Sequence, residues 1–200
     1  MNITIPIILI VGTYLVGSIP VGYLLTRYAT GKNIREYGSG NIGSTNVKRI
    51  AGKRIALITQ LLDMLKGLLP VSLYLLFLSS TGASSFWVYG VALAAILGHD
   101  FSVFLKFRGG KGVNTTLGAS VLLAPVAVFG SVALYFIVKW RFKYVSLGSL
   151  VLSAALPLID FILNDITPTF YYLLICTALI TVLHAKNIQR LLRNQEFPSR

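Results

Sequence analysis

Residues 112–138 read GVNTTLGASVLLAPVAVFGSVALYFIV, and they decide how many times the chain crosses a membrane. The stretch holds 27 residues without a charge, and Pro125 interrupts it near the middle. One helical crossing takes roughly 20 apolar residues, so this stretch is long for one span and short for two. The charges of the segments on either side therefore have to settle the number of crossings.

Five further apolar runs have about the length of a membrane span. They are residues 3–26, 55–78, 86–104, 144–163 and 168–183. The 200 residues are 55% hydrophobic and only 12% charged, whereas about a quarter of the residues of a soluble domain are charged. The first run has no basic segment before it and no small-residue cleavage signature after it, so we expect it to remain as a span. The composition predicts an all-α membrane protein.

The distribution of Lys and Arg favours two crossings within residues 112–138. With two crossings, every Lys and Arg except Lys66 lies on one face, in segments 27–54, 106–111, 139–143 and 186–200. One crossing would instead place Lys139, Arg141 and the basic C-terminus outside, against the positive-inside rule. We therefore predict one domain, residues 1–200, with seven transmembrane helices, the N-terminus outside and the C-terminus in the cytoplasm.

The length of residues 112–138 limits what those two crossings can be. At about 1.5 Å per residue, 27 helical residues reach roughly 40 Å, less than two passes through a hydrocarbon core about 30 Å thick. At least one of the two helices must therefore be short or re-entrant, with its irregular backbone buried in protein or facing water.

Composition also argues against several other classes of function. The net charge of +12 could suggest nucleic acid, but retention of Lys and Arg on the cytoplasmic side accounts for it, so we expect no nucleic-acid partner. The single cysteine, Cys176, lies in an apolar run, and the two histidines are far from it and from each other. Because this is no metal-ligand spacing, we expect no metal and no cofactor. No required protein partner is evident.

The first of three polar segments, which we call the first block, is the loop of residues 38–49, GSGNIGSTNVKR. Its glycines let the backbone approach a ligand and present N–H groups. Neutral hydrogen-bonding groups come from Ser39, Asn41, Thr45 and Asn46, and Lys48 and Arg49 add positive charge. This composition suits a phosphate. The alternative is an ordinary connecting loop whose basic residues only set topology.

The second block, residues 106–115 with the sequence KFRGGKGVNT, precedes a predicted helix. Backbone amides at a helix N-terminus favour an anion, and Lys111 adds a charge. The G-x-x-x-x-G-K-[ST] order of a Walker A loop is missing. We interpret the block as a phosphate-binding loop rather than as a glycine turn on the basic face.

The third block, residues 184–191 with the sequence HAKNIQRL, follows the last apolar run. On a helix His184 and Asn187 are neighbours three positions apart, so they can address one substrate from the membrane boundary. A histidine at an interface can also be purely structural. The predicted topology puts all three blocks on the cytoplasmic face, which suggests chemistry on a phosphorylated, water-borne substrate beside lipid.

Four more polar residues interrupt the apolar runs. Asp63 and Lys66 lie three positions apart within one run, and because charges are costly in lipid we expect them to pair and to face the bundle interior. For His99 and Asp100, just before the second block, we favour a supporting hydrogen-bonding role over catalysis.

These blocks closely resemble the bacterial acyl-phosphate:glycerol-3-phosphate acyltransferases. The order and spacing of the three blocks fit, as do residues 63–67 (DMLKG) and Gly98-His99 ahead of the second block. The resemblance runs nearly from end to end. It implies a multi-pass inner-membrane enzyme, usually of seven spans, that makes lysophosphatidic acid from acyl phosphate and glycerol 3-phosphate beside membrane lipid.

The resemblance also implies roles for individual residues. It assigns glycerol 3-phosphate binding to the second block, here Gly109, Gly110, Lys111 and Gly112, and we add Lys106 and Asn114 of the same block. It implies that Ser39, Arg49, His184 and Asn187 are needed for activity. We expect Asn41, Thr45 and Asn46 to contribute to substrate binding.

Two departures from the family pattern stand in these blocks. Ser44 occupies a position where many relatives have Ala. Ala185-Lys186 occupies a position where Arg-Glu is common. The third block therefore lacks a carboxylate, and any structural pair that this carboxylate forms in relatives is in doubt for this chain.

An acyl phosphate is already an activated mixed anhydride, so we expect direct transfer without a covalent enzyme intermediate. Asn187 and loop amides would stabilise the oxyanion, and Arg49 with Lys111 would hold the two phosphates. The base stays open between His184 and a substrate phosphate, with a slight preference for the phosphate. The alternative class of function is an anion transporter. The intramembrane Asp63 and Lys66 are typical of such proteins, but the sequence shows no inverted repeat.

Overall fold

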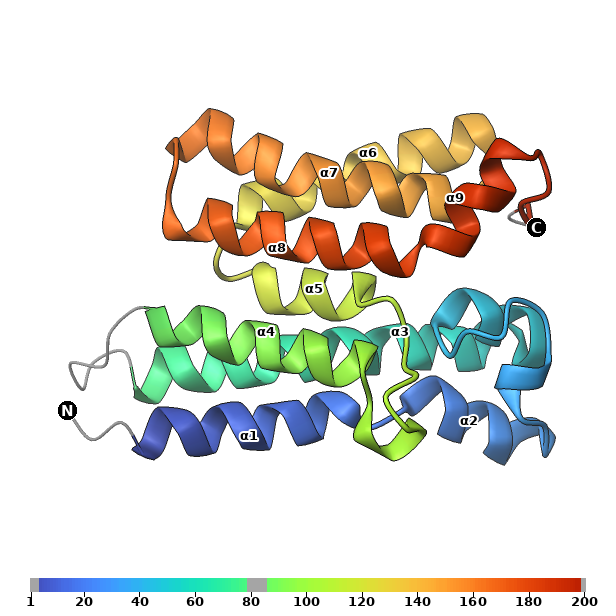
Figure 1. Ribbon diagram of the computed structural model, residues 1–200, viewed down its shortest axis with the longest axis horizontal. Helices are drawn as coiled ribbons and strands as arrows, with labels where there is room; N and C mark the ends of the chain where they lie inside the picture. The colour runs from blue at the N-terminus through green and yellow to red at the C-terminus, as the bar shows by residue number, and fades with distance from the viewer. Residues whose placement is uncertain (1–3, 79–85, 199–200) are drawn as a thin grey trace. The chain divides into compact units, whose positions relative to one another are not determined.

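The computed structural model describes residues 4–78 and 86–198, and this part of the chain is helical without a β-strand (Figure 1). In chain order the elements are α1 (Thr4–Ser18), α2 (Val21–Thr30), the 3-10 helix η1 (Ile34–Glu36), α3 (Ser44–Phe77), α4 (Phe86–Asp100), the 3-10 helix η3 (Val103–Leu105), α5 (Val113–Ser120), α6 (Pro125–Phe142), α7 (Val145–Asn164), α8 (Pro168–Leu183) and α9 (Ala185–Leu192). The predicted all-α class is confirmed for these residues.

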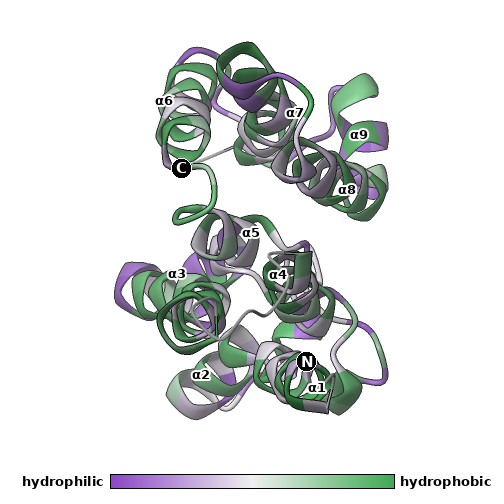
Figure 2. Cartoon of the chain, turned by 90° about the vertical axis from the view of Figure 1, so that its left-hand side faces the viewer, coloured by the Kyte–Doolittle hydropathy of each residue, from purple (hydrophilic) through white to green (hydrophobic). Residues whose placement is uncertain are grey.

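Five helical stretches in the described residues are long and apolar enough to cross a membrane. They are Thr4–Thr30, Ser44–Phe77, Phe86–Leu105, Pro125–Phe142 and Val145–Asn164, and α8 with α9, bent by 60°, makes a sixth if the pair counts as one span. Large apolar side chains such as Leu76, Phe129 and Val182 are exposed on them, as lipid-facing residues would be, and Figure 2 shows hydrophobic colour along the long helices. Seven passes and the orientation of the termini stay predictions.

The short helix α5 corresponds to the first half of residues 112–138. Its eight residues extend about 12 Å, well short of a hydrocarbon core about 30 Å thick. Helix α6 begins at Pro125, which suits the first helical turn because a proline there lacks only an N–H that would have no partner in the helix. The expected short helix is therefore present in the structure. Residues 79–85, which connect the predicted spans 55–78 and 86–104 and fall on the outer face in the predicted topology, lie outside the described residues.

The chain divides into two compact units, residues 1–122 and residues 123–200. In the first unit α1 packs on α4, and α3 packs on α2, α4 and α5. In the second unit α7 packs on both α6 and α8, and α9 contacts α7 and α8. The single domain expected from the sequence stays a prediction.

Two helical stretches are interrupted, one at Pro20 inside the predicted run 3–26 and one at Gly52 just before the predicted run 55–78. Pro20 separates α1 from α2, since a proline inside a helix has no N–H to donate and clashes with the preceding turn. Gly52, with φ +87° and ψ 174°, interrupts α3, and such a conformation suits glycine, which has no Cβ. The segment of α3 before Gly52 starts at Ser44, so the prediction that residues 38–49 form a loop was wrong for their second half.

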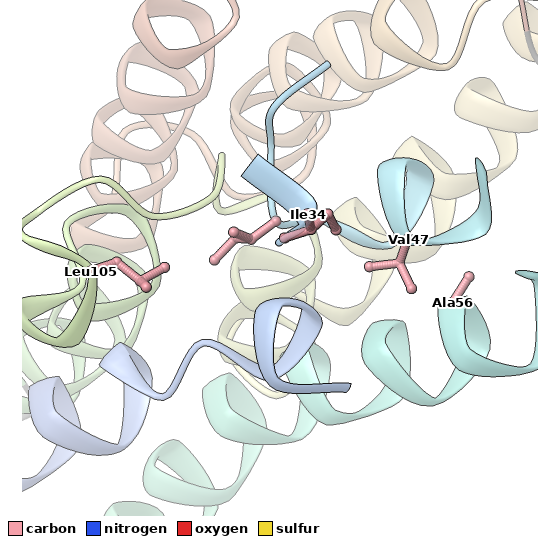
Figure 3. Close-up of a cluster of buried hydrophobic side chains, with 5 residues drawn as sticks. Ile34, Val47, Ala56 and Leu105 are labelled. Carbon is pink, nitrogen blue, oxygen red and sulfur yellow. The ribbon is translucent and has the colours of Figure 1, made fainter. Parts of the chain in front are cut away.

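A small hydrophobic cluster joins the first block to neighbouring segments (Figure 3). Its buried members are Ile42 and Val47 of the first block with Ile34, Ala56 and Leu105. Leu105 of η3 immediately precedes the second block, so this cluster connects the start of the second block to the first.

Candidate active site

The first block is organised around the side chain of Asn46, which is 1% exposed. Its Oδ1 accepts a hydrogen bond from the Ser39 N–H at 3.1 Å. Its Nδ2 donates to the carbonyls of Asn41 at 2.9 Å and Tyr37 at 3.0 Å, with a longer contact of 3.4 Å to Ile34 O. These bonds use most of the capacity of one amide, so in the structure Asn46 shapes the loop. Its predicted role in substrate binding stays a prediction.

Asn41 also holds the loop, because its Oδ1 accepts from the Gly43 N–H at 2.8 Å and so turns the chain into α3. Gly38 and Gly40 have φ of +58° and +70°, and an added Cβ at Gly38 would collide with Asn46 Oδ1. The side chains of Ser39 and Thr45 are half-buried at the surface of this frame, and Arg49 is exposed on the first segment of α3. The frame therefore leaves these three predicted residues at the solvent side of the block.

The second block lies against the C-terminal end of α4 through its backbone. The Gly109 N–H donates to Asp100 O at 3.0 Å, and the Gly110 N–H donates to His99 O at 2.9 Å. A Cβ on Gly110 would overlap the His99 imidazole, and a Cβ on Gly112 would come within 2.9 Å of both Asp100 carboxylate oxygens. Contact with α4 thus leaves no room for side chains at these glycines, and the backbone carbonyls of His99 and Asp100 hold the loop. A supporting role for the side chains of His99 and Asp100 stays a prediction.

Beneath this loop lies a buried group of charged side chains. Asp63 Oδ1 pairs with Lys66 Nζ at 2.8 Å and lies 3.5 Å from His99 Nδ1, with all three side chains at most 6% exposed. The predicted pairing of Asp63 with Lys66 is confirmed. Lys66 also donates at 3.3 Å to Ile19 O, which lies at the break between α1 and α2 and also accepts from the Val21 N–H at 3.0 Å. The group therefore joins α3, α4 and the α1–α2 break.

A direct contact links the first and second blocks within residues 1–122. Asn114 Nδ2 donates to Ser44 Oγ at 3.4 Å, across 70 positions of the chain. Lys111, between Gly110 and the start of α5, is half-buried, while Lys106 is exposed and has a left-handed φ of +54°. The fold thus brings a hydroxyl group of the first block into contact with an amide group of the second.

The third block begins at a sharp break in the helix at His184. Helices α8 and α9 are bent by 60° there, and His184 has φ −92° and ψ 5° between them. The buried His184 Nδ1 contacts Ile180 O at 2.8 Å, and since a carbonyl only accepts, Nδ1 carries the hydrogen. In the neutral ring Nε2 is then the acceptor nitrogen, which suits a residue that receives a hydrogen bond or a proton.

Asn187 lies one helical turn beyond His184 and is 6% exposed. Its N–H donates to His184 O at 2.8 Å, so the pair is held in register by the backbone, as the sequence predicts. Its side-chain Nδ2 donates to Glu196 Oε1 at 2.9 Å. Glu196 is a partner that the sequence analysis missed, although it is the single acidic residue after Asp165 in a basic C-terminal segment.

The predicted site residues therefore fall into two groups. Those of the first and second blocks lie in the unit of residues 1–122, and His184 and Asn187 lie in the unit of residues 123–200. No group of three or more His, Cys, Asp or Glu side chains with the geometry of a metal site occurs among residues 4–78 and 86–198.

The sequence was compared with protein families and with proteins of known function. The family model described as glycerol-3-phosphate acyltransferase matches residues 7–194. The glycerol-3-phosphate acyltransferase of Clostridium acetobutylicum is 43% identical, over 96% of this chain and 98% of the relative. That of Geobacter sulfurreducens is 42% identical, over 95% of both chains.

Two solved structures are similar as well, both of PlsY, an integral membrane glycerol 3-phosphate acyltransferase. The glycerol 3-phosphate form has a TM-score of 0.90 and the lysophosphatidic acid form one of 0.85. Each is 33% identical to this chain and covers 96% of it and 94% of its own length. The similarity extends over the segments that carry all three blocks. This chain therefore belongs to the glycerol-3-phosphate acyltransferase family of integral membrane proteins.

Proposed function

We propose that the protein transfers a fatty acyl group from acyl phosphate to the sn-1 hydroxyl of glycerol 3-phosphate, releasing lysophosphatidic acid and inorganic phosphate. The observation that carries the proposal is family membership over residues 7–194, which favours an enzyme over the alternative of an anion transporter. The similar PlsY structures are named for forms with glycerol 3-phosphate and lysophosphatidic acid, the acceptor and the product of this reaction. The acyl phosphate donor is inferred from the sequence resemblance.

In the proposed reaction the sn-1 hydroxyl oxygen attacks the carbonyl carbon of the acyl phosphate. A new ester C–O bond forms, and the carbonyl oxygen becomes an oxyanion. When the tetrahedral intermediate collapses, the bond breaks between the former carbonyl carbon and the oxygen that bridges it to phosphorus. Phosphate leaves with that electron pair. The hydroxyl proton passes to a substrate phosphate or to His184 Nε2. Because the donor is a mixed anhydride with a good leaving group, no enzyme nucleophile is needed.

Each block has a proposed part in this reaction. Arg49 and Lys111 hold the two phosphates, and the backbone of Gly109, Gly110 and Gly112 lets the glycerol phosphate approach closely. We assign the other predicted site residues of the first two blocks to orienting the substrates, namely Ser39, Asn41, Thr45, Asn46, Lys106 and Asn114. Asn187 donates to the oxyanion, where a hydrogen bond strengthens as negative charge develops. His184 orients the attacking hydroxyl.

An activity measurement with defined substrates tests the donor and the acceptor together. Purified protein in lipid should convert acyl phosphate and glycerol 3-phosphate to lysophosphatidic acid and phosphate, in equal amounts and in the presence of a chelator. Acyl coenzyme A offered in place of acyl phosphate should give no product. Loss of activity in chelator with recovery on adding a divalent ion would contradict the metal-free reaction, and uptake of one solute without product would favour a transporter.

We further propose seven passes in the bacterial inner membrane, with the three blocks on the cytoplasmic side. The basic segments at Lys139 to Lys143 and beyond Lys186 support this topology through the positive-inside rule. Reporters fused at Lys143 and at the C-terminus should read inside, and one at Asn164 should read outside. An outside reading at Lys143 would contradict the double crossing of residues 112–138.

A further inference from the structure

Helix α9 of the third block carries amide and basic side chains but no carboxylate, since its sequence is AKNIQRLL. Two of these side chains, Asn187 and Arg190, have N–H donors that a carboxylate can accept from.

In the structure the carboxylate comes from the C-terminal segment. Glu196 Oε1 accepts from Asn187 Nδ2 at 2.9 Å, and Glu196 Oε2 accepts from Arg190 Nε at 2.9 Å. One oxygen thus serves each partner. The side chain of Glu196 is 5% exposed, and a carboxylate is buried to this extent only when it is paired and hydrogen-bonded. The contacts therefore represent a formed structural unit rather than a solvent-exposed ion pair.

The backbone before Glu196 turns back toward α9 and so brings the Glu196 side chain to Asn187 and Arg190. Asn194 has a left-handed φ of +55°, which turns the chain back on α9. The Gln195 N–H donates to Arg190 O at 2.8 Å, and the Arg190 guanidinium lies over the Phe197 ring at 5.3 Å from its centroid. Arg190 is therefore held from two sides, and it holds Glu196 in turn.

We infer that Glu196 is a positioning residue for the acyl transfer and that it orients the Asn187 amide. A primary amide has two N–H donors in a fixed plane, so a bond from Nδ2 to Glu196 sets the direction of the second N–H. Arg190 neutralises the carboxylate, which keeps a negative charge beside Asn187 from repelling anionic substrates. The inference rests on the proposed function, in which Asn187 donates to the oxyanion.

Steady-state kinetics of three single variants in the full-length protein test the inference. In Glu196→Ala the amide loses its anchor, and we expect turnover to fall about tenfold while the KM values for both substrates change less than about twofold, because only the transition-state bond depends on the orientation. Glu196→Gln keeps an oxygen that can accept from Asn187, so its turnover should fall by about threefold or less. Gln195→Ala, an exposed neighbour, is the matched control and should behave as wild type.

A double-mutant cycle separates orientation of Asn187 from simple anchoring of the tail. If Glu196 acts through Asn187, adding Glu196→Ala to Asn187→Ala should lower turnover no further. Full additivity of the two effects, or wild-type turnover in Glu196→Ala, would overturn the inference. Should Glu196→Ala fail to fold by size-exclusion chromatography, Glu196→Gln in the same cycle gives the decision, with additivity again counting against the inference.

Failure of the proposed function has a different signature. If Asn187→Ala kept normal turnover, the oxyanion role of Asn187 would be wrong, whatever Glu196→Ala did. If Asn187→Ala lost turnover and Glu196→Ala did not, the proposed function would stand and only the positioning role of Glu196 would be lost.

Discussion

Asn46 and Asn187 are two buried asparagines that the sequence analysis assigned to the same substrate site, yet the structure uses them differently. Asn46, 1% exposed, bonds to backbone groups of the chain that precedes it, at Tyr37, Ser39 and Asn41. Asn187, 6% exposed, has its Nδ2 directed at one side chain, Glu196. An amide bound to several backbone groups of its own loop stabilises the shape of that loop, whereas the bond to Glu196 fixes the orientation of an amide on a helix.

The same contrast separates the glycine-rich blocks from the third block. In the first and second blocks, glycines and buried side chains arrange the backbone, and backbone N–H groups and exposed basic side chains are what a ligand can meet. In the third block, a helix break places individual side chains, His184 and Asn187, at a bend. We therefore expect substitutions in the third block to lower turnover and substitutions in the first two to affect substrate binding and stability.

The largest effect is expected for His184→Ala and Asn187→Ala. Turnover should fall roughly 10² to 10³-fold, because each side chain is assigned to an interaction that strengthens in the transition state. KM for glycerol 3-phosphate should change little. The measurement is steady-state kinetics at saturating acyl phosphate, with Lys186→Ala, an exposed residue of the same helix, as the matched control. A variant that kept normal turnover and lost only affinity would move the third block to substrate positioning.

The next effect is expected for Asn46→Ala. The change leaves the Ser39 N–H and the Tyr37 and Asn41 carbonyls without their partner, and buried polar groups without partners destabilise a fold. We expect the free energy of unfolding in detergent to fall by roughly 3 kcal/mol and KM to rise. Asn41→Ala, which removes the hydrogen bond that Asn41 Oδ1 accepts from the Gly43 N–H, should lower the free energy of unfolding by about a third as much. Equal stability of Asn46→Ala and wild type would show that the amide does not organise the block.

A smaller effect on binding is expected for Gly110→Ala, whose methyl group would overlap the His99 imidazole. Displacement of the second block should raise KM for glycerol 3-phosphate roughly tenfold and leave turnover nearly unchanged. The double variant Gly110→Ala with His99→Ala removes the ring that the methyl group meets. Recovery of KM relative to His99→Ala alone would show that contact with α4 is the cause. An unchanged defect would mean that the methyl group obstructs the ligand itself.

The smallest effect is expected for Ser44→Ala, which introduces the residue common in relatives. The contact from Asn114 Nδ2 to Ser44 Oγ measures 3.4 Å, near the limit for a hydrogen bond, so it contributes little. Turnover, KM and melting temperature should all stay within about twofold or a few degrees of wild type. A loss as large as that of Gly110→Ala would mean that this link between the first and second blocks controls their geometry.

Much of the fold follows from local sequence properties. The span at residues 168–183 coincides with α8 as predicted, and Asp63 pairs with Lys66 because three positions on a helix place their side chains on one face. The break at Ile19 and Pro20 and the start of α3 at Ser44 were missed. The length of an apolar run does not indicate where a proline breaks the helix within it. The glycines and polar residues of the first block are typical of a loop, so the start of a helix among them was not predicted.

The sequence by itself determined that this is a membrane protein, which three segments carry its polar chemistry, and which family it belongs to. Hydropathy, charge asymmetry and motif spacing are all readable along the chain. Only the tertiary structure decided that Asn46 builds a loop, that Lys66 reaches Ile19 across 47 positions, that Asn114 meets Ser44 across 70, and that Glu196 holds Asn187. A side chain with several possible partners bonds to the one that packing brings within about 3 Å, and helix packing is not encoded in any single local pattern.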